Sequence, residues 1–242
     1  MTNLFDEKRL KILRDVRSFL IRLLAITLLI FLVTLFFVEK IMRKLNDIIK
    51  MKLILYSLPE AFMSYLKLAL FISLLIVVPY IIIEVVNLLN KHTSFKGSKN
   101  FVIVIVATLL FYAGAAFCYF IVLPSGIKFL LQYQTESIKP MIALSSYISF
   151  VFTFVFTFGI MFELPLFMFI LGSLGLITVK MLNQKRRFFI LGNSILSAIL
   201  TPTPDVFNML LMMVPLQVLY EVGIIVVLFT GKQKLQKNAE TV

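Results

Sequence analysis

The 242-residue sequence has no tryptophan, one cysteine and one histidine. The single cysteine, Cys118, excludes a disulfide framework and a cysteine-based metal site. The lone His92 has no cluster of histidines or carboxylates around it, so haem and zinc lack a ligand set and we expect no cofactor. The missing tryptophan, together with abundant isoleucine, lysine, phenylalanine and asparagine, indicates an AT-rich genome such as that of an organelle or an endosymbiont.

Acidic residues are also scarce, and long stretches of the chain carry no charge at all. There are 12 Asp and Glu residues against 24 Lys and Arg residues, and 60% of the chain is hydrophobic. Soluble domains are about 45–50% apolar. The apolar segments have the length of helices rather than the alternation of barrel strands. The sequence therefore predicts an all-α integral membrane protein.

We expect six transmembrane helices within residues 18–229, between a basic amphipathic segment at 1–17 and a basic polar tail at 230–242. Pro79 is expected to break the second span, and Pro124 is expected to end the third span in a loop. The last two spans are short, because residues 188–200 make only about 20 Å of helix. The expected spans are 18–38, 65–89, 101–123, 144–174, 188–200 and 206–229.

The placement of lysine and arginine predicts the orientation in the membrane. With the N-terminus inside, the inner segments hold 16 of the 24 Lys and Arg residues. Cytoplasmic loops carry an excess of these residues, so we expect both termini inside. Lys67 would then reach out to the outer membrane surface, and the K-R-R at 185–187 would face anionic lipid headgroups on the inner side.

Glu163 is the one charged residue between residues 140 and 179. Forty residues of helix exceed the roughly 30 Å of bilayer hydrocarbon, so this acid lies at membrane depth. Pro165 predicts a kink beside it. An acid in this position could titrate a proton, dock a partner helix or anchor a neighbouring helix by a hydrogen bond.

Other acids have simpler explanations. Asp205 follows two prolines and is expected to cap the last helix. Glu84 and Glu221 lie toward the inner ends of their helices, where Glu221 can pair with a basic loop residue.

Several segments, read in order, resemble the TatC family, the multispanning core subunit of the twin-arginine protein translocase. The resemblance covers about residues 55–230. The segments that carry it are P-E-A-F at 59–62, S-Y-I-S-F at 146–150, F-G-I-M-F-E-L-P at 158–165, T-P-T-P-D at 201–205 and P-L-Q-V-L-Y-E at 215–221. The L-x-x-L-R stretch that ends at Arg14 is a weaker match.

The resemblance implies six helices in a concave, glove-like arrangement, and a transport function rather than an enzyme. Such a protein binds twin-arginine signal peptides and single-span partners of the TatA/TatB type, can self-associate, binds no nucleic acid, and moves folded proteins by the proton-motive force. It implies a partner-docking role for Glu163, Pro165 and Tyr147. Residues matching the outer cap and the turn between the short helices are Glu60, Phe62, Pro202 and Asp205.

One departure from the family concerns the loop after the second span. The family carries a glutamate there that meets the signal peptide's arginines, whereas residues 94–100 read S-F-K-G-S-K-N and include Lys96. Lysines repel arginines. Leu88 also replaces the family's aromatic residue, and Met209 replaces a glutamine beyond Asp205. Signal recognition is therefore altered, or it is supplied by Glu84, Asp15 or Glu7. The residues matched to the signal-peptide side are Arg14, Glu84, Leu88 and Lys96.

Two other interpretations stay open at this point. The chain could be a proton-coupled carrier or a membrane subunit of an organellar respiratory or ATP-synthase complex. It could also be a TatC-like scaffold that has lost transport. The departures from the family, together with the missing tryptophan, favour a mitochondrial or plastid membrane, and otherwise a bacterial plasma membrane, as the location.

Overall fold

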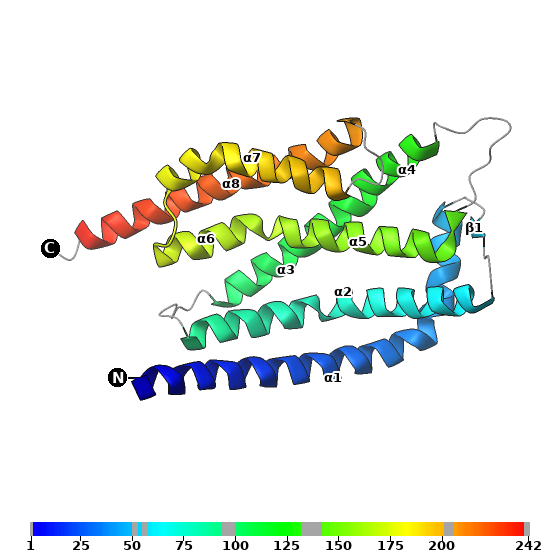
Figure 1. Ribbon diagram of the computed structural model, residues 1–242, viewed down its shortest axis with the longest axis horizontal. Coiled ribbons are helices and arrows are strands. Elements are labelled where there is room, and N and C mark those ends of the chain that lie inside the picture. The colour runs from blue at the N-terminus through cyan, green and yellow to red at the C-terminus, as the bar shows by residue number, and fades with distance from the viewer. Residues whose placement is uncertain are drawn as a thin grey trace. The chain divides into compact units, whose positions relative to one another are not determined.

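The computed structural model describes residues 2–49, 53–54, 58–92, 100–131, 142–200 and 206–239. This part of the chain is almost entirely helical, with two very short strands (Figure 1). The elements are α1 (Thr2–Ile49), β1 (Leu53–Ile54), α2 (Leu58–His92), α3 (Asn100–Phe117), a π-helical turn (Cys118–Val122), α4 (Leu123–Leu131), β2 (Ile142–Ala143), α5 (Leu144–Phe162), α6 (Leu164–Leu174), α7 (Val179–Leu200) and α8 (Val206–Ala239).

The predicted all-α, multi-span membrane fold is confirmed. Within the part of the chain that the structure describes, five helical segments are long and apolar enough to cross a bilayer: Leu13–Arg43, Pro59–Leu88, Asn100–Ile127, Leu144–Leu174 and Met212–Phe229. The remaining predicted span, residues 188–200, forms the second half of α7. The first half of that helix is basic and lowers its mean hydropathy, so α7 is not among the five candidate membrane-spanning helices. Helix α8 continues past the expected end of the last span to Ala239.

The chain divides into two compact units, which we describe separately. In the first unit (Met1–Thr108 and Ile138–Phe152), α1 lies antiparallel along α2 (Figure 1). The hydroxyl of Thr34 on α1 donates to the carbonyl of Ala69 on α2 at 3.2 Å. Small residues on α2, including Ala69, are fully buried, and small side chains allow membrane helices to approach closely.

The two strands also belong to the first unit and were not expected from the sequence. β1 pairs in parallel with β2, with Leu53 opposite Ile142. Near this pairing, the Lys67 ammonium group donates to the hydroxyls of Ser145 and Ser149 at 2.7 and 3.2 Å. Lys67 therefore binds α5 in addition to any contact with the membrane surface.

Two expectations about proline were wrong. Helix α2 runs without interruption through Pro79, because a membrane helix tolerates the loss of one amide donor. The third span does not end in a loop at Pro124, since α4 continues to Leu131. A π-helical turn precedes it, in which the Leu123 amide donates to the Cys118 carbonyl five residues back. This wider turn accommodates the proline, whose nitrogen has no hydrogen to donate.

In the second unit (Leu109–Ser137 and Thr153–Val242), α8 packs against α6 and α7 (Figure 1). A Cβ atom at Gly223 of α8 would lie 2.3 Å from the sulfur of Met168 on α6, so any larger residue there would require the Met168 side chain to move. Met168, Tyr220, Ile224 and Val227 form the buried cluster between these helices.

Candidate functional site

Glu163 lies at a break between two helices. Helix α5 ends at Phe162 and α6 begins at Leu164. The Glu163 amide bonds the Ile160 carbonyl three residues back at 3.1 Å, and its carbonyl accepts from the Phe167 amide at 2.9 Å. Pro165 has no amide hydrogen and therefore cannot extend the hydrogen bonds of α5, but it fits the first turn of a new helix. Where the sequence predicted a kink, the structure has a one-residue interruption of the helix at Glu163.

The carboxylate of Glu163 has unused hydrogen-bonding capacity. Its Oε1 atom is buried and has no hydrogen-bond partner among the described residues. The carboxyl group also has a hydrogen bond with the backbone of Phe111 on α3, so Oε1 alone is without a partner among the described residues. Tight packing brings α3 this close, since a Cβ atom at Gly159 would lie 2.6 Å from the Phe111 ring. The fold therefore places a partly buried acid in apolar surroundings with one oxygen unsatisfied.

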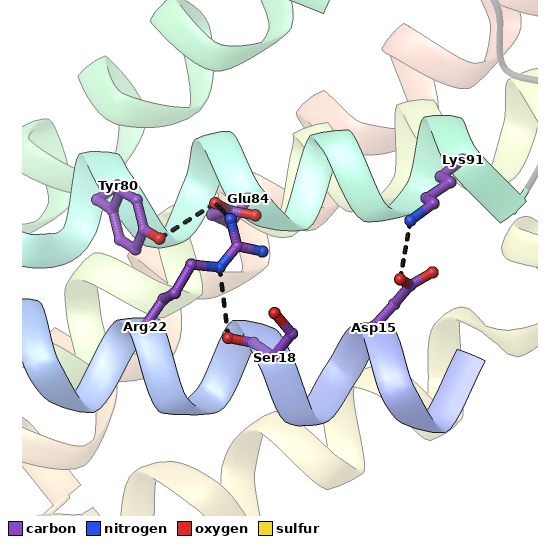
Figure 2. Close-up of polar contacts among 6 residues, drawn as sticks. All are labelled: Asp15, Ser18, Arg22, Tyr80, Glu84 and Lys91. Carbon is purple, nitrogen blue, oxygen red and sulfur yellow. Dashed lines mark hydrogen bonds and ion pairs between the residues drawn. The ribbon is translucent and has the colours of Figure 1, made fainter. Parts of the chain in front are cut away.

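A second group of charged residues joins α1 to α2 (Figure 2). Arg22 pairs with Glu84 at 3.2 Å, and Lys91 pairs with Asp15 at 2.8 Å. The Tyr80 hydroxyl also donates to Glu84 Oε1 at 3.1 Å. We refer to Asp15, Arg22, Glu84 and Lys91 as the charged seam.

The charged seam has a regular spacing. The two residues contributed by each helix are seven positions apart, which is two helical turns, so the two ion pairs follow one another along the same contact line. The acids are the more enclosed partners: the Glu84 and Asp15 side chains are 17% and 22% exposed, whereas Arg22 and Lys91 are 56% and 53% exposed. Two of the three acids proposed for signal recognition, Asp15 and Glu84, are thus already paired with cations of the chain itself, and those cations are about half exposed.

A third polar contact joins α7 to α8. Arg186 forms a short ion pair with Glu221, as the sequence suggested, and the Gln217 amide also donates to Glu221 at 3.2 Å. The Tyr220 hydroxyl donates to the Leu182 carbonyl at 2.9 Å, and its ring stacks on Phe189 with centroids 3.9 Å apart. These bonds fix the register of α7 on α8.

The remaining predicted site residues are distributed over the chain. Arg14 and Phe62 are exposed, while Tyr147, Leu88 and Glu60 are partly buried. Lys96, Pro202, Asp205 and the side chain of Glu7 lie outside the described residues. Arg22 and Lys91 were not predicted from the sequence as partners of Asp15 and Glu84. Their seven-residue spacing from Asp15 and Glu84 is the signal that could have revealed them.

Comparison with known proteins agrees with this architecture. A family model described as Sec-independent protein translocase protein (TatC) matches residues 11–215. The chain belongs to the TatC family. A TatC protein of Carboxydothermus hydrogenoformans is 36% identical over 183 residues, which cover 75% of each chain. A tatC-like protein of Gracilaria tenuistipitata, ycf43, is 28% identical over 175 residues, covering 72% of this chain and 73% of that one.

A solved structure supports the same family. The crystal structure of the twin-arginine translocase receptor TatC superposes with a TM-score of 0.79 at 31% identity, covering 91% of this chain and 99% of that one. The chain is accordingly a TatC core component of the twin-arginine translocase, a transport protein and not an enzyme. The interpretation as a proton-coupled carrier or a subunit of a respiratory complex is thereby set aside.

Proposed function

We propose that this TatC chain captures single-span partner subunits of the TatA/TatB type at Glu163 and twin-arginine signal peptides at the charged seam. Together with these partners it moves folded proteins across an energy-transducing membrane by the proton-motive force. The observation that carries the proposal is the buried, unpaired oxygen of Glu163 at the helix break.

An unpaired polar atom in an apolar environment is costly, typically by about 1–3 kcal/mol. A partner helix that presents a hydroxyl or amide donor would supply the missing hydrogen bond and recover this free energy on binding. Because Pro165 interrupts the backbone hydrogen bonds between α5 and α6 beside Glu163, a hydrogen-bond donor of a partner helix could approach the acid there.

Replacing Glu163 tests this role. We expect Glu163→Ala to insert and fold but to lose co-purification of single-span partners, while Glu163→Gln retains part of it because an amide can still hydrogen-bond. Glu221→Gln is the matched control, since Glu221 is also acidic but is already paired within the chain. Full transport of a folded cargo by Glu163→Ala would remove Glu163 from the mechanism.

Signal recognition is the second part of the proposal. Guanidinium groups of a signal peptide can replace Arg22 and Lys91 on Glu84 and Asp15, because the exchange conserves the number of ion pairs and both native cations are exposed. We expect the double variant Asp15→Asn/Glu84→Gln to reduce crosslinking of a twin-arginine peptide several-fold relative to a twin-lysine peptide. Equal crosslinking by wild type and double variant would place recognition elsewhere.

The loop at residues 94–100 allows a separate test of whether its charge affects binding of the signal peptide. Lys96→Glu restores an acid to a segment where the family carries one, and it should strengthen crosslinking of a twin-arginine peptide. No gain would indicate that the loop does not meet the peptide.

The orientation and the host membrane are also proposals. The lysine and arginine distribution supports both termini inside. Composition supports a mitochondrial or plastid copy, with a bacterial plasma membrane as the other location. Labelling single cysteines placed at residues 11 and 234, in a Cys118→Ser background, would test the orientation, and mapping the gene to its genome would test its origin.

The absent loop carboxylate favours one further candidate function, a scaffold that no longer transports. Deleting the gene and following a folded cofactor-containing protein separates the two. Continued crossing of that protein would favour the scaffold.

A further inference from the structure

Two cations on α7 flank an exposed aromatic ring. The Lys185 ammonium lies 5.7 Å, and the Arg187 guanidinium 5.0 Å, from the ring centroid of Phe188. Both cations are exposed, and within the described residues neither pairs with a carboxylate. Arg186, between them, is different, because it pairs with Glu221 on α8. The α7 surface therefore presents two positive charges that the described part of the chain does not neutralise.

An exposed apolar stripe begins at the same ring. Phe188, Leu191, Ile195 and Ile199 follow the spacing of one helix face, and they are 56%, 59%, 54% and 75% exposed. The stripe and the two cations are consecutive along α7, so one elongated amphipathic ligand could contact both. A polar anionic group would meet the cations, and its hydrocarbon part would cover the stripe.

The apolar half of α7 is shorter than the bilayer core is thick, which places lipid headgroups close to the two cations. The apolar half of α7, residues 188–200, measures about 20 Å, whereas the hydrocarbon core is about 30 Å thick. A short apolar helix is accommodated by local thinning of the bilayer and by long basic side chains that reach the headgroups. Lys185 and Arg187 lie directly at this boundary.

We propose that this face of α7 binds one anionic phospholipid, with the phosphate between Lys185 and Arg187 and an acyl chain along the apolar stripe. A soluble anion would use the cations alone and leave the stripe uncovered, and a basic peptide would be repelled by the two positive charges. An acidic phospholipid matches both parts of the surface.

The absence of tryptophan allows a direct test. Phe188→Trp introduces the only tryptophan of the chain and keeps an aromatic ring beside the two cations. The full-length variant is placed in nanodiscs containing phosphatidylcholine and a small fraction of brominated lipid, whose bromine atoms quench nearby indole fluorescence. We expect brominated phosphatidylglycerol to associate at least about fivefold more strongly than brominated phosphatidylcholine, because two cations near a surface each favour anionic lipid.

Removing the two cations should abolish the preference. In the Phe188→Trp background, Lys185→Gln/Arg187→Gln should reduce the ratio to near one. The matched control Lys11→Gln/Arg17→Gln removes the same charge from exposed positions on α1 and should leave the ratio unchanged. Helix content and a monodisperse elution profile establish that each variant is folded.

Three results would overturn the proposal. These are equal quenching by the two brominated lipids, an unchanged preference in Lys185→Gln/Arg187→Gln, and a loss of preference in the control, which would indicate a general charge effect. Release of the quencher by inorganic phosphate at constant ionic strength would also contradict it, since it would show that a free anion suffices.

Discussion

The charged seam and the helix break each contain a glutamate, and the two differ in how many partners they have within the chain. Glu84 in the seam has two partners, the Arg22 guanidinium and the Tyr80 hydroxyl, and a similar pair lies two turns away. Glu163 has a buried oxygen with no partner in the described part of the chain. In the first region the acids satisfy bonds within the fold, whereas in the second the fold leaves a bond to be made by something else.

The difference implies opposite signs for stability when each acid is neutralised. An exposed ion pair typically contributes about 0–1 kcal/mol, so neutralising Glu84 removes a small stabilisation. An unsatisfied buried polar atom costs about 1–3 kcal/mol, so replacing Glu163 by an apolar residue relieves a cost. A residue whose removal stabilises the fold but impairs function is the signature expected of a binding group.

The largest expected effect therefore concerns Glu163→Leu. The free energy of unfolding of this variant should exceed that of the wild type by about 1–3 kcal/mol, because the unpaired oxygen is gone. The variant should therefore unfold at a higher denaturant concentration or temperature. At the same time, transport of a folded cargo should fall at least about tenfold if the missing hydrogen bond comes from a partner. Unfolding in detergent and a transport assay in vesicles measure the two effects.

A stabilised but active Glu163→Leu protein would show that the acid is merely tolerated. A destabilised variant would show that the bonds of Glu163 within the folded chain, such as that to the Phe111 backbone, outweigh the cost of the unpaired oxygen, and would contradict the predicted difference from Glu84.

The next prediction concerns the break itself. Pro165→Ala restores an amide donor and should allow α5 to continue into α6, which turns the Glu163 side chain while keeping its charge. Partner co-purification should fall by a few-fold, with less change in stability. Disulfide crosslinking from single cysteines near residue 163 to a partner helix would detect the reorientation. Unchanged crosslinking would mean that the break does not position the acid.

The helix break could be predicted from the sequence, whereas the charged seam has only the seven-residue spacing of its residues as a sequence signal, which does not specify which residues pair. A proline two residues after the one charge in a forty-residue apolar run specifies both a break and a buried acid, and both features are local. The partners of Asp15 and Glu84 depend instead on the register of α1 against α2. That register is set by buried contacts such as Thr34 to Ala69, which lie more than thirty residues apart in sequence.

Other failures have similar causes. The β1–β2 pairing joins two-residue strands, which are too short to show any alternation of apolar and polar residues. Pro124 has no amide hydrogen and was therefore expected to end the helix. The π-helical turn before it accommodates the proline, and the chain continues as α4. Local patterns predicted the transmembrane helices, and the family resemblance supplied the transport function.

A smaller effect is expected when the charge in the seam is reversed. Glu84→Arg places a second guanidinium beside Arg22 and should destabilise the protein by about 1 kcal/mol through lost pairing and repulsion. Adding Arg22→Glu exchanges the two charges and should recover most of the loss. Thermal unfolding of the single and double variants in detergent measures both steps. No recovery in the double variant would show that the Tyr80 hydrogen bond, and not the ion pair, determines the stability contributed by Glu84.

The smallest expected effect is the coupling free energy between Asp15 and Lys91, which measures how much one ion pair of the charged seam contributes to stability. A double-mutant cycle with Asp15→Asn and Lys91→Gln should give a coupling of about 0.2–1 kcal/mol, because the lysine is half exposed. The coupling should decrease when the salt concentration is raised from 0.1 to 1 M, since the screening length falls from about 10 to about 3 Å. A coupling that is large and insensitive to salt would mean that the pair is shielded from solvent. In that case the arginines of a signal peptide could not exchange with Lys91 at low cost, and recognition by the charged seam would depend on Glu84 alone.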